Sequence, residues 1–194
     1  MSHVERILCL SFLALSASGC AGQFNIKTSI DEDGYTITQL VDNEIGIEGE
    51  RGYGDYAIEG VDIDLAGVYR AVYLDPVKRA RFGETPVYFL RLTYTGQEEL
   101  HFERRKSLEL KIDGHGPYVL RGSGAVSRSH DAPNNRYTES FDYAVEMDVL
   151  LLISRAQDVT LVITGRDVVL DGYLLDRNFD NYRRFVDKYV DEIR

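Results

Sequence analysis

The chain has 194 residues, of which 32 are acidic and 22 are basic, and its formal net charge is −10. This length suits one folded domain, and 44% hydrophobic with 28% charged residues is typical of a globular protein rather than a disordered one. The acidic balance argues against a general nucleic-acid-binding protein, because phosphate binding needs a basic surface. The sequence has no apolar run of the length that a membrane-spanning helix requires.

The first twenty residues are organised like a secretory signal. A short polar segment ends at Arg6, a mostly apolar stretch runs from Ile7 to Ala17, and Ser-Gly-Cys20 follows directly. An apolar stretch of this length that ends in small residues is typical of a signal peptide, and it is too short to span a membrane stably. We therefore predict a signal peptide over residues 1–19. The alternative is a buried N-terminal helix of the folded domain.

The segment Ala17-Ser18-Gly19-Cys20 resembles the lipobox of bacterial lipoproteins. The resemblance implies cleavage before Cys20, diacylation of its thiol and acylation of the new amino terminus. Cys9 lies in the part that would be removed, so Cys20 would be the only cysteine of the mature chain, and lipidation would consume its thiol. Two or more acyl chains give stable anchoring in a membrane. Ala21 follows the cysteine, where an Asp would disfavour export, so the resemblance implies the outer membrane in a host with two membranes.

Charge is concentrated in one segment near the N-terminus. Between Asp31 and Asp64 there are eleven acidic residues and one basic residue, Arg51, whereas the charges after residue 64 nearly cancel. The glycine-rich part of this segment, residues 43–60, lacks apolar periodicity and is predicted to be a long loop or mobile connector. A weak divalent-cation site or a partner-binding strip is one interpretation, and a solvated, self-repelling segment is the favoured one.

Most of the remaining sequence has the period-two alternation of β-strands. A hairpin is predicted over residues 24–40, with its turn at Gly34. Further strands are predicted over residues 65–74, 87–95, 107–112, 118–120, 137–143, 159–164 and 168–175. Polar loops are predicted over residues 75–83 and 127–136. Short strands joined by turns at this spacing predict a mainly β fold, either an antiparallel β-sandwich or an open barrel.

Two segments have the period of a helix instead. Apolar residues recur at helical spacing over residues 145–156, which predicts a short helix. A C-terminal amphipathic helix is predicted over residues 178–194, with an aromatic stripe that includes Phe179, Tyr182 and Phe185. We expect this stripe to pack on the sheet of the same chain. The expected organisation is a lipid-anchored N-terminal segment over residues 20–64 and a single β-rich domain over residues 65–194.

Motifs that would assign an enzymatic reaction are missing from the sequence. The three histidines after Cys20, which are His101, His115 and His130, do not form an HExxH pattern. Ser129-His130-Asp131 contains the residue types of a hydrolase triad, but neighbours along a chain point apart and no Gly-x-Ser-x-Gly turn accompanies them. The sequence therefore assigns no catalytic, cofactor-binding or metal-binding residue.

Two basic clusters are the candidate contacts with an anionic glycan, a lipid headgroup or an acidic partner. The clusters consist of Lys78, Arg79 and Arg81, and of Arg104, Arg105 and Lys106. The alternative is that they serve solubility, or that they are counter-charges for the acidic segment within the same molecule.

These features together predict a lipid-anchored protein of the bacterial cell envelope that acts as a binding or structural module. Its expected partners are the membrane, through the anchor, and an envelope protein or glycan, with no nucleic acid and no cofactor. The alternative is a secreted hydrolase, such as a glycosidase that uses two carboxyl groups, because that chemistry needs no motif that is visible in a linear sequence.

Overall fold

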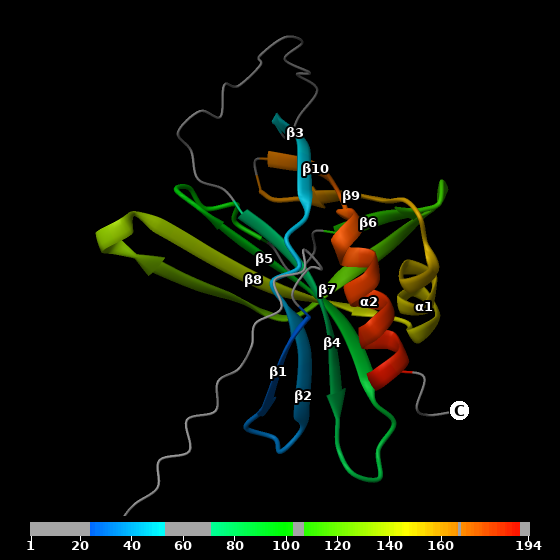
Figure 1. Cartoon of the computed structure of the whole chain (residues 1–194). Coiled ribbons are helices and arrows are strands. Elements are labelled where there is room, and N and C mark those ends of the chain that lie inside the picture. Colours follow the sequence, from blue (N-terminus) through cyan, green and yellow to red (C-terminus); the bar gives the residue numbers. More distant parts are fainter. Residues whose placement is uncertain (1–23, 53–70, 103–106, 167, 191–194) are drawn as a thin grey trace, which may run out of the picture.

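The structure is a computed structural model that describes residues 24–52, 71–102, 107–166 and 168–190 (Figure 1). Several predicted features lie outside these residues, namely the signal peptide over residues 1–19, the lipidation site Cys20, the domain boundary after residue 64, and Arg104, Arg105 and Lys106.

The described part of the chain is mainly β, with two α-helices. The strands are β1 (Asn25–Ile30), β2 (Thr36–Val41), β3 (Gly46–Gly52), β4 (Ala71–Ala80), β5 (Val87–Gly96), β6 (Ser107–Ile112), β7 (His115–Asp131), β8 (Arg136–Val145), β9 (Val159–Thr164) and β10 (Val168–Tyr173). The helices are α1 (Met147–Arg155) and α2 (Asp176–Tyr189), and a short 3-10 turn, η1 (Ala132–Asn134), joins β7 to β8.

All ten strands belong to one antiparallel sheet in the order β1-β2-β4-β5-β8-β7-β6-β9-β10-β3. Strand β2 lies near one end of this order and β3 lies at the other end, yet only residues 42–45 separate them in the chain. Four residues span at most roughly 14 Å, so the sheet must curl until its two ends approach each other. The result is a half-barrel, which confirms the predicted mainly β fold in its open-barrel form (Figure 1).

Residues 42–45, which we call the seam, connect the two ends of the sheet. Asp42 has a left-handed backbone with φ of 67°, which turns the chain away from β2. Beyond that turn, the amide of Leu74 donates to the carbonyl of Asn43 at 3.0 Å, and the amide of Ile45 donates to the carbonyl of Val72 at 2.9 Å. Strand β4 is therefore bordered first by the seam and then by β2. Through these pairings the predicted 24–40 hairpin, observed as β1 and β2, joins the main sheet.

Strand β4 lies further along the chain than predicted. It runs through Asp75 and Pro76 to Ala80, where the sequence analysis placed a loop over residues 75–83. A proline inside a strand removes one ladder hydrogen bond and is tolerated where no neighbour needs its N–H. Pro76 satisfies this condition, because the seam pairs with β4 up to Leu74 and β2 begins to pair at Val77.

Two further loop predictions were wrong for related reasons. Residues 46–52, predicted as part of a connector, form β3 and pair with β10, and the ring of Tyr173 lies directly over Gly46 where a larger residue would not fit. Residues 127–131, predicted as part of a polar loop, continue β7 and pair with β8. Both segments are rich in polar or small residues and lack an apolar face, so alternation could not reveal them as strands.

The core lies between the sheet and the two helices. On β5, Tyr88, Leu90, Leu92 and Tyr94 are buried, whereas the residues between them are partly exposed. We call the face with the buried residues the inner face and the opposite one the outer face. The inner face shares one hydrophobic cluster with the buried side of both helices, so α1 and α2 fill the hollow side of the half-barrel.

Both helices confirm the predicted elements with small shifts of their ends. Helix α1 begins at Met147 rather than at residue 145, and α2 begins at Asp176 rather than at residue 178. In α2, Phe179, Tyr182, Phe185 and Val186 are buried, so the aromatic stripe faces the sheet of its own chain. Asp176 in the first turn and Lys188 in the last turn complement the helix dipole.

Candidate functional site

The first basic cluster is held by contacts within the chain. Lys78 donates from Nζ to the carbonyl of Tyr189 at 2.6 Å, where it satisfies a backbone acceptor at the end of α2. Arg79 donates from Nε to Asp31 at 2.8 Å and from Nη2 to Asp33 at 3.0 Å. The anion-binding role predicted for these residues stays a prediction, and the contacts of Arg79 are those expected of a counter-charge for the acidic segment.

Arg81 is the most accessible member of this cluster. Its guanidinium lies 5.5 Å from the centre of the Tyr35 ring, and its Nη1 lies 3.7 Å from a carboxylate oxygen of Glu84. Both contacts are weak at a solvent-exposed position. Arg81 is therefore the residue of this cluster that is best placed to reach a partner.

The Ser129-His130-Asp131 sequence lies near the end of β7 and does not form a catalytic relay. His130 stacks on Tyr137 of β8 with ring centres 4.2 Å apart, and Asp131 accepts a hydrogen bond from Asn134 at 2.6 Å. Successive residues of a strand face opposite sides of the sheet. These three side chains therefore cannot form the hydrogen-bonded relay of a catalytic triad.

Two carboxyl groups are deeply buried in the described residues, and they lie on opposite faces of the sheet. Glu139 is on the inner face of β8, where it accepts hydrogen bonds from the amides of His101 at 2.8 Å and Phe102 at 2.9 Å. Asp75 is on β4 opposite Arg91, on the outer face. A glycosidase needs two carboxyl groups that flank one bond. Asp75 and Glu139 do not have that arrangement.

Asp75 collects the hydrogen bonds of a polar network on the outer face. Its Oδ1 accepts from the side-chain amide of Asn43 at 2.9 Å and from the backbone amide of Asn43 at 3.2 Å, and its Oδ2 accepts from Gln39 at 3.2 Å. Arg91 determines which atom of Gln39 donates in this network. A guanidinium can only donate, and its Nη1 donates to Oε1 of Gln39 at 2.8 Å, so the side-chain nitrogen of Gln39 faces Asp75. Asn181 of α2 donates to Oδ1 of Asn43 at 3.1 Å, so the network joins the seam to the C-terminal helix.

The pKa of Asp75 reflects two opposing effects. Desolvation by burial raises it from 3.8 to about 6, although the hydrogen bonds from Asn43 and Gln39 lower it. A carboxylate that only accepts hydrogen bonds matches the three donors that face it, whereas a protonated carboxyl would place a donor among donors. Burial outweighs these hydrogen bonds, so the pKa of Asp75 on β4, beside the seam, is raised to about 6.

The outer face carries a hollow of about 280 Å³ beside this network, over β2, β4, β5 and the β7–β8 pair, which we call the outer hollow. It is lined by Asp31, Ile37, Val77, Arg79, Phe89, Arg91, Ser123, Gly124 and Asp142. Arg91 donates to Asp142 through both Nε, at 2.6 Å, and Nη2, at 2.8 Å, which is the bidentate geometry of a strong ion pair. A second ion pair, between Arg79 and Asp31, lies on the opposite side of the outer hollow.

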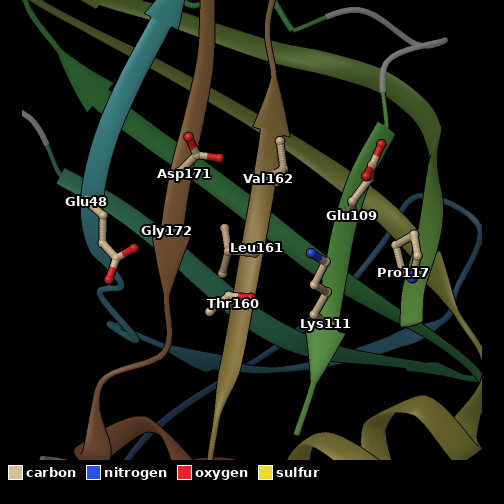
Figure 2. Close-up of a pocket in the computed structure, with 9 residues that line it drawn as sticks. All are labelled: Glu48, Glu109, Lys111, Pro117, Thr160, Leu161, Val162, Asp171 and Gly172. Atoms are coloured by element: carbon tan, nitrogen blue, oxygen red, sulfur yellow. The ribbon is translucent and has the colours of Figure 1, made fainter. Parts of the chain in front are cut away.

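A second hollow, of about 380 Å³, lies over β3, β10, β9 and β6, and we call it the acidic hollow (Figure 2). Carboxyl groups of Glu48, Asp171 and Glu109 come from three different strands, and Lys111 extends from β6 toward β9 (Figure 2). Gly172 and Leu161 also border the acidic hollow, but Leu161 is only 2% exposed and belongs to the core. The lining of the acidic hollow, as far as the structure describes it, contains no aromatic side chain.

The described ranges contain neither a metal-binding cluster nor a membrane-spanning helix. Within them, no group of three or more histidine, cysteine, aspartate or glutamate side chains is arranged to hold a metal ion. Neither described helix has the length and apolar character needed to cross a membrane.

Comparisons with known proteins give no further assignment. No protein-family model matches the chain, and no curated protein or solved structure matches it either. The outer hollow is therefore the candidate binding site on its own geometry.

Sequence reasoning singled out Arg79 and placed Asp31 in the acidic segment, but it missed the second ion pair of this site, Arg91 with Asp142. Arg91 stands in an otherwise apolar strand, at a position that alternation assigns to the exposed face, and this was the available signal. Asp142 becomes its partner only because β8 pairs with β5, although 51 positions separate the two residues in the chain. The strand order cannot be read from alternation alone.

Proposed function

We propose that this chain is a lipid-anchored binding module of the bacterial cell envelope, attached through Cys20 and located at the outer membrane where the host has two membranes. The observation that carries the proposal is the apolar stretch that ends in Ser-Gly-Cys20, followed by a chain without another cysteine. A thiol that is the only one in a secreted chain needs a chemical role, and acylation supplies one.

The arrangement of the folded, β-rich part of the chain favours binding over catalysis. The inner face is occupied by the side chains of the chain's own helices, and the deeply buried carboxyl groups Asp75 and Glu139 face away from each other. The outer face offers a polar-rimmed hollow with an apolar floor, which is a common form for small binding sites.

The anchor is tested by replacing each cysteine in turn. In cells that produce the full chain, Cys20→Ser should block acylation, so the protein should move to the soluble fraction or keep the mass of the unprocessed chain. Cys9→Ser is the matched control, because it changes the other cysteine and should leave the mature product unaltered. Incorporation of an alkyne-labelled fatty acid should be lost only in Cys20→Ser. If Cys20→Ser stays in the membrane fraction with unchanged mass and label, the proposed anchor is wrong.

A protein partner is tested by crosslinking and pulldown from intact envelopes. The informative variant reverses Arg81, Arg104, Arg105 and Lys106 to Glu while it keeps Lys78 and Arg79, because those two residues make contacts that hold α2 and the β1–β2 turn. A partner bound through the basic clusters should disappear in this variant. Unchanged partners would exclude that mode of contact and would leave the anchor untouched.

A further inference from the structure

The outer hollow has balanced charges, although it is framed by two arginines. In the first ion pair the side chains of Arg79 and Asp31 are 31% and 26% exposed. In the second pair those of Arg91 and Asp142 are 30% and 27% exposed. Each guanidinium in the lining is thus matched by a carboxylate in the lining, and all four remain within reach of a ligand. An anionic ligand would have to displace Asp142 from a bidentate pair, so the hollow does not select for negative charge.

The same ion pairs suit a ligand that can donate and accept hydrogen bonds at neighbouring atoms. A hydroxyl group has one donor hydrogen and two acceptor lone pairs, so adjacent hydroxyls can accept from a guanidinium and donate to the carboxylate beside it. Two such pairs on either side of one hollow favour a ligand with hydroxyl groups on more than one edge.

The floor of the outer hollow is apolar and includes an aromatic ring. Phe89, Val77 and Ile37 line it, and all three project from the outer face of neighbouring strands. An aromatic ring in the floor can pack against the C–H face of a flat, polar-edged ring. With a volume of about 280 Å³, the outer hollow is near the lower limit for small-molecule sites and suits one or two ring-sized units.

One wall of the outer hollow is formed by an irregular stretch of β7. The register between β7 and β8 shifts between Ser123 and Ser127, so the backbone of the residues between them leaves the ladder. Gly124 lies in this bulge with φ of 85°, and no atom comes within 4 Å of the place where its Cβ would be. Glycine at such a position permits close approach of another molecule to the backbone.

We propose that the outer hollow binds a neutral saccharide unit of a cell-envelope glycan, with the ring on Phe89 and the hydroxyl groups between the Arg79–Asp31 and Arg91–Asp142 pairs. This inference rests on the proposed function, because the anchor is what would bring the domain to the envelope. An extended peptide also donates and accepts hydrogen bonds, but its backbone favours a continuous strand edge, whereas this hollow is closed by ion pairs on two sides.

The test is co-sedimentation of the full-length Cys20→Ser chain with purified peptidoglycan sacculi, with chitotetraose and the free stem peptide as soluble competitors. Phe89→Ala removes the ring from the floor, and Ser123→Phe fills the hollow from an exposed position beside Asp142. Lys111→Met is the matched control, because Lys111 lines the acidic hollow. Thermal melting of each variant reports whether it is folded.

The proposal predicts that the chain is retained by sacculi and released by chitotetraose but not by the stem peptide. Phe89→Ala and Ser123→Phe should each weaken retention at least about tenfold, whereas Lys111→Met should retain the affinity of the parent chain. The proposal is overturned if the parent chain is not retained, if the stem peptide releases it, or if folded Ser123→Phe binds as well as the parent. None of these results affects the fractionation of Cys20→Ser, so a failure of the glycan site and a failure of the anchor are distinguishable.

Discussion

The two faces of strands β4, β5 and β8 are built from alternate residues of the same segments, yet they have opposite chemistry. The inner face places Leu74, Leu92 and Phe141 side by side in the core, all fully or almost fully buried. At the neighbouring position of each strand, the outer face places Asp75, Arg91 and Asp142 side by side, with Arg91 bound directly to Asp142 and linked to Asp75 through Gln39. The comparison shows how one sheet can separate the side chains that stabilise it from those that are available to a ligand.

The largest loss of folding stability is expected from a truncation that exposes the inner face. A chain that ends before Asp176 loses α2, whose buried side includes Phe179, Tyr182, Phe185 and Val186. Each such side chain stabilises by roughly 1.5–3 kcal/mol on burial, and the sum, about 6–12 kcal/mol, is comparable to the whole stability of a typical domain. The truncated chain should show no cooperative transition in thermal melting. A transition at the Tm of the full chain would contradict the assigned role of the helix.

An intermediate effect on stability, which depends on pH, is expected from Asp75, the buried carboxyl group of the outer face. Because burial raises the pKa of Asp75 above its unfolded value, the folded state binds the proton more tightly, and stability falls as pH rises through about 6. A shift from 3.8 to about 6 corresponds to about 3 kcal/mol between pH 7 and pH values below both pKa values. The lowered pKa values of Asp31 and Asp113 act in the opposite direction, but only below about pH 4.

Asp75→Asn isolates this contribution. Urea unfolding of the parent chain should give a larger free energy at pH 5 than at pH 7, and this difference should shrink markedly in the variant. The variant should also lose one hydrogen bond at pH 7, because its amide would face a donor of Asn43 or Gln39. An unchanged pH dependence would show that another group titrates in this range.

A smaller effect separates two buried tyrosines of the inner region. The hydroxyl of Tyr182 donates to the carbonyl of Leu74 at 2.9 Å, whereas that of Tyr143 has no hydrogen-bond partner among the described residues. Tyr182→Phe should therefore lower the free energy of unfolding by about 1 kcal/mol, and Tyr143→Phe should leave it unchanged or raise it. Denaturant unfolding of the two variants checks this pair. Equal losses would mean that the Tyr143 hydroxyl is satisfied in solution.

Much of the inner face could be predicted from the sequence, because apolar alternation reports burial directly. The strand over residues 87–95 and the aromatic stripe of the C-terminal helix are examples, and both are confirmed. The candidate site could not be predicted in the same way. Arg91 and Asp142 are neighbours only because β5 pairs with β8. Asp75 was assigned to a loop because the adjacent Pro76 is a residue that usually ends a strand, although β4 continues through both. Local patterns contain no information about these long-range pairings.

The glycine-rich strand β3 shows a different limit. Gly46 and Gly49 suggested a connector, but they fit a strand because Tyr173 covers Gly46 and because the seam is short enough to bring β3 to the edge of β10. This segment becomes a strand through its surroundings rather than through its own propensity. The position of β3 therefore depends on contacts with segments that are far away in the sequence.

The most direct test of the division between the two faces is urea unfolding of two variants at adjacent positions on β5, Leu90→Ala and Phe89→Ala. Leu90 is fully buried on the inner face, so its truncation should lower the free energy of unfolding by about 2–5 kcal/mol. Phe89 is half-buried on the outer face, so its truncation should lower that free energy by less than half as much. Equal losses, or a larger loss for Phe89→Ala, would contradict the claim that side chains of the inner face contribute most of the apolar burial while the outer hollow is available for binding.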